Sequence, residues 1–65
     1  MTESTTNKAA RILIVEDEAA IRTLISFACA AAGYEVECVE DALQAQSIVD
    51  STPPDLILLD YMLPE

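Results

Sequence analysis

Four carboxylates follow directly after two short apolar segments, and their positions indicate where this chain could perform chemistry. Residues 12–15 are followed by the acids of residues 16–18, and residues 56–59 are followed by Asp60. A short, uninterrupted apolar run bounded by turn-forming residues is typical of a strand that is buried on both faces of a parallel sheet. In open sheets of this kind, ligands bind beyond the carboxyl ends of the strands. We therefore expect the acids to meet at one edge of a sheet.

Clustered carboxylates suit a hard cation and phosphoryl chemistry. Glu16, Asp17 and Asp60 would repel one another at a shared edge unless a cation joined them or one was protonated. Mg²⁺ fits such a cluster, because it binds one or two carboxylates and fills its remaining positions with water and phosphate oxygens. With the cation in place, an Asp carboxylate can attack a phosphoryl donor and form an aspartyl phosphate. The pattern therefore predicts a magnesium-dependent phosphoryl-acceptor site.

Each acid also has a simpler explanation when it is considered alone. Asp17 or a neighbouring residue could cap the helix that follows, and Glu16 and Glu18 could be solvated acids that favour the positive end of that helix. Asp60 could merely begin a turn before Pro64. Only their combination, at the ends of two adjacent buried strands, favours the functional interpretation.

The segments between the acids predict the elements that position them. Residues 19–32 have a helical apolar period and are followed by Gly33, which can adopt the conformation of a C′ residue without steric cost. Residues 34–40 alternate between apolar and acidic side chains, which indicates a half-exposed strand at the sheet edge. Asp41 is the expected N-cap of a second helix that runs to about Ser51. The expected buried positions are Ile21, Leu24, Ile25, Ala28 and Ala31 or Ala32 in the first helix, and Ala45, Ile48 and Val49 in the second.

The element order predicts an α/β fold with one parallel sheet. Strand, helix, strand, helix and strand alternate along the chain, and the crossover connections between parallel strands are right-handed. That handedness places the first strand between the other two, in the order 2-1-3. The carboxyl ends of the first and third strands then lie side by side, which brings Glu16, Asp17 and Asp60 together.

Length and composition exclude several classes of protein. The 65 residues form one domain at most, and a hydrophobic content of 52% argues against a disordered chain. The apolar stretches are too short to span a membrane, and we expect residues 1–10 to be a disordered polar tail and not a signal peptide. We therefore expect a cytoplasmic protein. The net charge of −9 argues against direct nucleic-acid binding by this segment.

The cysteines do not indicate a metal or redox site. Cys29 and Cys38 lack the close spacing of such sites, and the sequence contains no histidine that could help to bind zinc. We expect both to be buried, reduced thiols that pack as small hydrophobic side chains.

Three segments resemble the receiver domain of bacterial two-component response regulators. They are residues 12–18, which resemble the first strand and its acidic pair, the turn at Gly33–Tyr34, and residues 54–64, which are similar to the phosphoacceptor segment. The resemblance covers residues 11–65 and implies the N-terminal part of a flavodoxin-like receiver fold. The amino-acid sequence of residues 58–64 is most similar to the corresponding segment in receivers of winged-helix transcription factors of the phosphate-regulon type.

The resemblance also implies roles for individual residues. Asp60 would be the phosphoacceptor, Asp17 would bind Mg²⁺ directly with Glu16 assisting, and Met62 would give its backbone carbonyl to the metal. The family implies a sensor histidine kinase as the phosphoryl donor. Its intact domain is a phosphoacceptor and not an enzyme, apart from its own phosphorylation and dephosphorylation. The parent protein would be a DNA-binding transcriptional regulator, with DNA contacts made only by an output domain.

The chain departs from the family pattern because it stops after the third predicted strand. The family's remaining two strands and three helices, with its switch Ser/Thr and its Lys, have no counterpart here. We therefore expect a fold truncated to βαβαβ, an exposed apolar edge at the third strand, and a partly ordered or self-associated chain.

Two alternatives remain open from the sequence. The first is a truncated, non-signalling fragment. The second is a haloacid-dehalogenase-like, Mg²⁺-dependent phosphohydrolase with Asp60 as its nucleophile. That family usually carries a second Asp two residues after the nucleophile, where this sequence has Met62.

Overall fold

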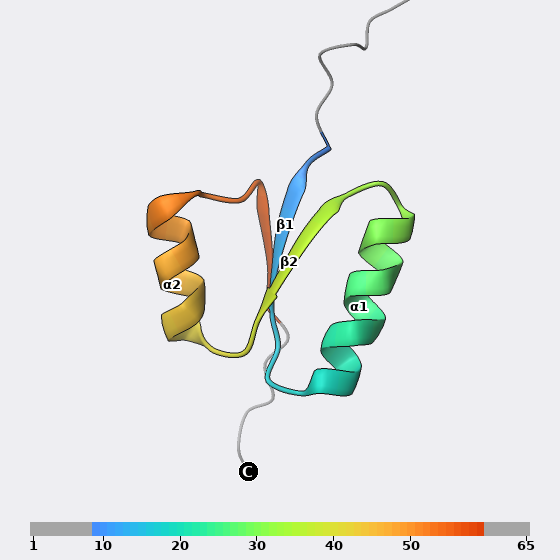
Figure 1. Cartoon of the computed structure of the whole chain (residues 1–65), viewed down its shortest axis with the longest axis horizontal. Coiled ribbons are helices and arrows are strands. Elements are labelled where there is room, and N and C mark those ends of the chain that lie inside the picture. Colours follow the sequence, from blue (N-terminus) through green and yellow to red (C-terminus); the bar gives the residue numbers. More distant parts are fainter. Residues whose placement is uncertain (1–8, 60–65) are drawn as a thin grey trace, which may run out of the picture.

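The computed structural model describes residues 9–59 of the chain. Its elements are β1 (Arg11–Val15), α1 (Ala19–Ala31), β2 (Glu35–Val39), α2 (Ala42–Ser51) and β3 (Leu56–Leu59), as drawn in Figure 1. All strand pairs are parallel, and the sheet has the order β2-β1-β3. The predicted α/β class and strand order are therefore confirmed, and β2 lies at a sheet edge as its alternating sequence predicted. Asp60, Met62 and Pro64 lie outside the described residues.

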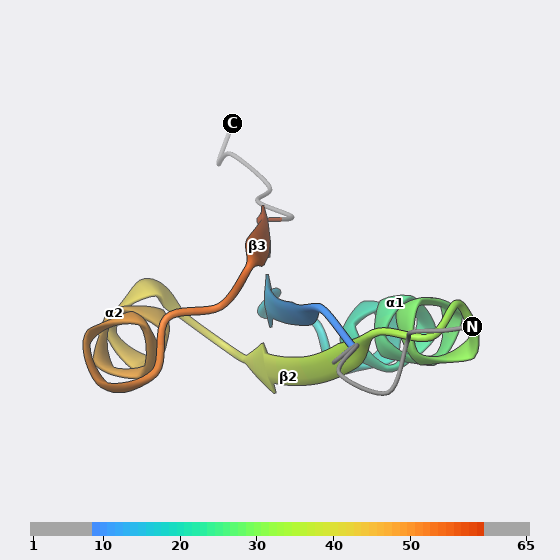
Figure 2. The same ribbon diagram turned by 90° about the horizontal axis from the view of Figure 1, so that it is seen from above.

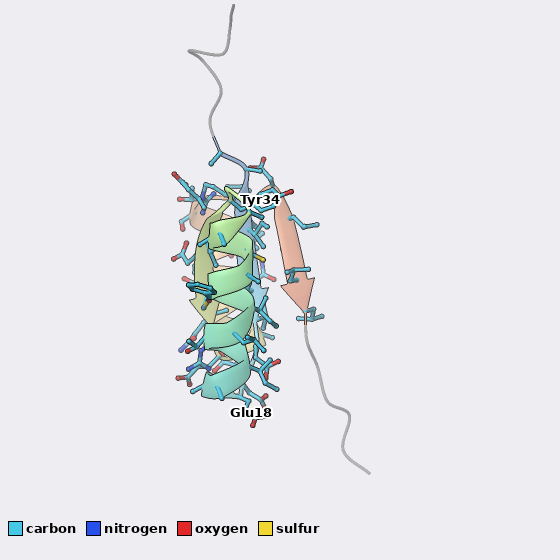
Figure 3. All side chains as sticks on the ribbon, turned by 90° about the vertical axis from the view of Figure 1, so that its right-hand side faces the viewer. Glu18 and Tyr34 are labelled. Atoms are coloured by element: carbon cyan, nitrogen blue, oxygen red, sulfur yellow. The ribbon has the colours of Figure 1, made fainter. Side chains whose placement is uncertain are left out.

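The two helices cover opposite faces of the sheet. Figure 2 shows α1 on one side of the strands and α2 on the other. Each helix packs against β1 and β2, and among residues 9–59 neither packs against β3. In the view of Figure 3, β3 accordingly stands to one side of α1 and is not covered by it. None of the helices in the described region is long and apolar enough to cross a membrane.

The core is centred on β1, which is buried on both faces as predicted. Leu13 and Val15 form a buried cluster with Val39 of β2, and α2 packs on this cluster. The residues of α2 that do so are those predicted from the sequence, Ala45, Ile48 and Val49. Ile12 and Ile14 are also buried, and the alternation of side chains along a strand directs them to the opposite face of the sheet.

The prediction that β3 is buried on both faces is wrong. Leu56, Ile57 and Leu59 are 51%, 45% and 65% exposed. The reason is that β3 lies at the sheet edge with a strand on one side only, and neither helix covers it in the described part of the chain. The expected exposed apolar edge at this strand is confirmed.

The apolar face of α1 is narrower than its sequence period predicts. Ile21 and Ile25 are half-buried, but Leu24 is 67% exposed, and so is Phe27 at 74%. Because α1 packs on only β1 and β2, a single line of its side chains reaches the sheet, and Leu24 lies outside it. Ala28, Ala31 and Ala32 are exposed as well. The prediction that Leu24, Ala28 and Ala31 or Ala32 are buried is therefore wrong, and only Ile21 and Ile25 of the predicted face are half-buried.

The helix ends follow local rules. Gly33, with φ of 100°, is the C′ residue of α1 as predicted, and the N–H groups of Gly33 and Tyr34 donate to the carbonyls of Ala30 and Cys29 at 3.0 and 3.2 Å. This pair of bonds is a Schellman motif. Asp41 caps α2 as predicted, because its Oδ1 accepts the N–H of Gln44 at 2.9 Å. The N-cap of α1 is Glu18, which makes no side-chain capping bond, so Asp17 is not the cap.

An arginine at the amino end of β1 holds β3 and the segment before it in place. The Arg11 guanidinium donates to the carbonyl oxygens of Thr52 and Pro53 at 3.2 and 2.9 Å. It also lies 3.6 Å from a carboxylate oxygen of Glu37 on β2. One side chain of the central strand therefore connects β2, β1 and the entry to β3 at the amino end of the sheet.

Candidate functional site

The three strands end at the same level of the sheet. Val15, the last residue of β1, is paired with Val39 of β2 on one side and with Leu59 of β3 on the other. The segments that follow β1 and β2 therefore leave the sheet from one edge, and they carry the acids Glu16–Glu18 and Glu40–Asp41. Asp60 follows Leu59 in the sequence, but it lies outside the described residues.

Glu16 is the buried acid of this edge. It is only 3% exposed, so it is not the solvated first-turn acid that its sequence position alone favoured. Its Oε2 accepts the backbone N–H of Glu18 at 2.8 Å, and its own N–H donates to the carbonyl of Val39 at 3.1 Å. The second bond extends the β1–β2 ladder by one residue. A buried carboxylate needs such partners to offset the loss of water.

Asp17 lies differently from its neighbour. It occupies the bend between β1 and α1, and it is exposed. Glu18 follows it as the N-cap residue of α1 and lies at the lower end of that helix in Figure 3, opposite Tyr34. The loop therefore presents one exposed carboxylate, Asp17, next to a buried one, Glu16.

Sequence reasoning missed Arg22 as part of this edge. The Arg22 Nη1 donates to the backbone carbonyl of Glu16 at 2.9 Å, and its Nη2 lies 3.9 Å from Oε2 of Glu40. One feature of the sequence could have indicated this contact. Arg22 lies in the first turn of the helix that follows the acidic loop, and from there a long side chain can reach the backbone of that loop.

Arg22 is the only cation near the carboxyl ends of the strands in the region from residue 9 to 59. The other cation in this region is Arg11, which lies at the opposite end of β1. The edge therefore combines an excess of carboxylates with one fixed guanidinium. The single guanidinium offsets only part of this negative charge, and the remaining negative charge favours binding of a cation.

The donor atoms fit a hard divalent ion. Glu16 and Asp17 supply carboxylate oxygens, which are the ligands that Mg²⁺ prefers. Residues 9–59 hold no group of three or more His, Cys, Asp and Glu side chains that could bind a metal ion by itself. A metal ion bound by Glu16 and Asp17 would thus need further oxygen ligands. Mg²⁺ fits this requirement, because it commonly retains water molecules and binds phosphate oxygens.

The cysteines lie apart from this loop. Cys29 on α1 and Cys38 on β2 are free thiols, and both are half-buried where full burial was expected. The Sγ of Cys38 lies 2.7 Å from the Oγ of Ser26, which also donates to the carbonyl of Arg22 at 2.7 Å.

Comparison with known proteins identifies the family. The profile described as "Response regulator receiver domain" matches residues 12–65. The chain is 53% identical over 53 residues to the phosphate regulon transcriptional regulatory protein PhoB of Pseudomonas aeruginosa, covering 82% of this chain and 23% of that protein. It is 44% identical over 55 residues to the DNA-binding dual master transcriptional regulator RpaA of Synechocystis, covering 85% of this chain and 23% of RpaA.

A third relative shows the same relationship. The alkaline phosphatase synthesis transcriptional regulatory protein PhoP of Bacillus subtilis is 40% identical over 55 residues, which cover 85% of this chain and 23% of PhoP. The chain thus spans about a quarter of the length of these curated relatives. The matched profile, the parallel 2-1-3 sheet and the acidic loop after β1 agree, and the chain belongs to the response regulator receiver domain family.

Proposed function

We propose that this chain is a phosphoacceptor module of a two-component phosphorelay. In this proposal a sensor histidine kinase supplies the phosphoryl group, and Asp60 accepts it. The phosphorus–nitrogen bond of the phosphohistidine breaks, a bond forms between phosphorus and a carboxylate oxygen of Asp60, and the histidine nitrogen keeps the electron pair. The main support is the pairing of Val15 with Leu59, because the acidic loop and Asp60 directly follow these two residues in the sequence.

The proposed metal ligands are Glu16, Asp17, Asp60 and the backbone carbonyl of Met62. When bound, Mg²⁺ would offset negative charge on the attacking carboxylate and on the incoming phosphoryl group. The part of this set that the structure describes contributes the two carboxylates of the β1–α1 loop. Glu16 is buried and held by the Glu18 N–H, so it offers a positioned oxygen at the base of the loop, while exposed Asp17 offers an accessible one.

The wider role is proposed from the relatives. Those described above are named as transcriptional regulators, so we propose that residues 11–65 form the N-terminal part of the receiver domain of a cytoplasmic transcriptional regulator. In such a protein this segment would be modified without acting as an enzyme on an external substrate. Its net charge of −9 supports the view that DNA contacts belong to another part of the parent.

The phosphoacceptor role can be tested with acetyl phosphate. The 65-residue chain is incubated with acetyl phosphate and Mg²⁺, and intact-mass spectrometry follows the addition of one phosphoryl group. We expect an adduct on the wild type that is lost in Asp60→Asn. Asp50→Asn is the matched control, because Asp50 is an exposed acid on α2 whose side chain contacts that of Gln46.

The outcomes separate the proposed role from its alternatives. An adduct that forms on the wild type and on Asp50→Asn but not on Asp60→Asn supports the phosphoacceptor. Absence of an adduct on folded wild type contradicts the proposal for this chain and favours a non-signalling segment. Repeated release of phosphate from a phosphoester, with no stable adduct, would favour the phosphohydrolase.

A further inference from the structure

The β1–α1 loop is held by a side chain that belongs to the helix following it. Arg22 lies in the first part of α1 and is mostly buried, with 21% of its side chain exposed. Its guanidinium donates to the Glu16 carbonyl at 2.9 Å and lies 3.9 Å from the Glu40 carboxylate, beyond the end of β2. One planar group therefore bridges the segments that follow two adjacent strands.

This bridge is one of three hydrogen bonds that hold Glu16 among the described residues. The Glu16 N–H is bound to Val39, the Glu16 carboxylate accepts the Glu18 N–H, and the Glu16 carbonyl accepts from Arg22. The first bond is part of the sheet ladder, and the second is internal to the loop. Of these three bonds, the Arg22 bond is the one that connects the loop backbone to a side chain of the helix, so it constrains the direction in which the chain leaves β1.

We propose that Arg22 is a positioning residue that sets the divalent-cation affinity of the acidic loop, an inference that rests on the proposed Mg²⁺-dependent function. Arg22 touches neither the phosphoryl group nor the cation in this proposal. It holds the Glu16 carbonyl, and through it the carboxylates of Glu16 and Asp17, in one arrangement before the cation binds. Groups outside the first set of metal ligands commonly act in this way, by fixing the orientation of the ligands.

Two contributions of Arg22 oppose each other and must be separated. Its positive charge beside the acids disfavours a second cation, so loss of the charge alone would strengthen Mg²⁺ binding. Its hydrogen bond orders the loop, so loss of the bond alone would weaken Mg²⁺ binding. The Glu40 contact is long and Glu40 is largely exposed, so it contributes less than the bond to the Glu16 carbonyl.

Arg22→Lys separates the two contributions because it retains the charge. A lysine ammonium lacks the planar fork that bridges the Glu16 carbonyl and the Glu40 carboxylate. The experiment is a titration of the 65-residue chain with MgCl₂, followed by the amide chemical shifts of Asp17 and Glu18. We expect Arg22→Lys to raise the dissociation constant about tenfold, the lower end of the usual effect of losing such an outer contact.

A second measurement needs no metal. In the Mg²⁺-free chain, exchange of the Glu18 amide hydrogen reports the bond from that amide to the Glu16 carboxylate. We expect this exchange to be faster in Arg22→Lys than in the wild type, while the amides in the centre of α1 remain unchanged. Arg11→Lys is the control for general loss of stability, because it removes a comparable set of arginine contacts at the opposite end of β1. It should leave the Mg²⁺ affinity unchanged.

The results distinguish three conclusions. Weaker Mg²⁺ binding and faster Glu18 exchange in Arg22→Lys, but not in Arg11→Lys, support positioning by Arg22. Unchanged affinity in Arg22→Lys contradicts it, and tighter binding in Arg22→Met would then assign Arg22 a purely electrostatic effect. If the folded wild type shows no Mg²⁺-dependent shifts, the proposed function fails, and Glu18 exchange alone decides whether Arg22 orders the loop.

Discussion

Arg11 and Asp55 are joined by two hydrogen bonds at the amino end of the sheet. The Arg11 N–H donates to Oδ2 of Asp55 at 2.7 Å, and the Asp55 N–H donates to the carbonyl of Arg11 at 2.9 Å. These residues precede the β1–β3 pairing that begins with Ile12 and Leu56. The Arg11–Asp55 pair therefore helps to hold an edge strand that neither helix covers in the described part of the chain.

The Asp55 side chain should contribute measurably to stability. Asp55→Ala removes the acceptor of the Arg11 N–H, and we expect it to lower the free energy of unfolding by about 1 kcal/mol. Urea denaturation followed by circular dichroism measures this change, and hydrogen exchange should show that the β3 amides lose the most protection. Asp55→Asn is the matched control, because its side-chain oxygen can still accept the bond. Equal stability of wild type and Asp55→Ala would mean that the Asp55 side chain does not help to hold β3.

Gly33 should resist substitution because of its backbone and not because of its surroundings. Its φ is 100°, and apart from Gly33 itself and its two chain neighbours no heavy atom lies within 4 Å of the position that a Cβ would occupy. Gly33→Ala therefore introduces backbone strain without a clash, and we expect a loss of about 1–2 kcal/mol in the free energy of unfolding. Thermal and urea unfolding measure it. Gly33→Asn should cost less, since Asn adopts positive φ more readily. A neutral Gly33→Ala would indicate that the end of α1 rearranges.

The exposed edge of β3 should cause self-association. Ile57 lies in the middle of this apolar edge, and a charged side chain there would hinder pairing with a strand of another chain. We expect the average mass in sedimentation equilibrium to rise with concentration for the wild type and to rise much less for Ile57→Lys. Leu43→Lys, on the exposed side of α2, is the control with the same change of charge.

The dependence of self-association on ionic strength provides an independent test of the predicted contact at β3. The net charge of −9 opposes contact between copies, so a higher ionic strength should strengthen association by screening this repulsion. A compact, cooperatively melting monomer at all concentrations would contradict the predicted self-association. Association that is equal in Ile57→Lys and wild type would place the contact elsewhere, and the exposed Leu24 and Phe27 on α1 would be the next residues to substitute.

Features that depend on local rules could be predicted from the amino-acid sequence. The elements alternate as predicted, Gly33 ends α1, and Asp41 caps α2. These features follow from steric limits on the backbone and from hydrogen bonds between residues close in the chain. The strand order agrees with the sequence-based prediction, and with right-handed crossovers this order places the two helices on opposite faces of the sheet, as observed.

The burial of several side chains and the long-range bonds depend on how the elements pack, and the sequence did not predict them. Leu24 and the residues of β3 are apolar, yet they are exposed, since burial depends on whether another element lies opposite. Glu16 is charged, yet it is buried, since the end of β2 and the start of α1 close around it. The contact between Arg22 and Glu40 likewise requires the end of β2 to lie beside α1, a placement that no local pattern of residues specifies.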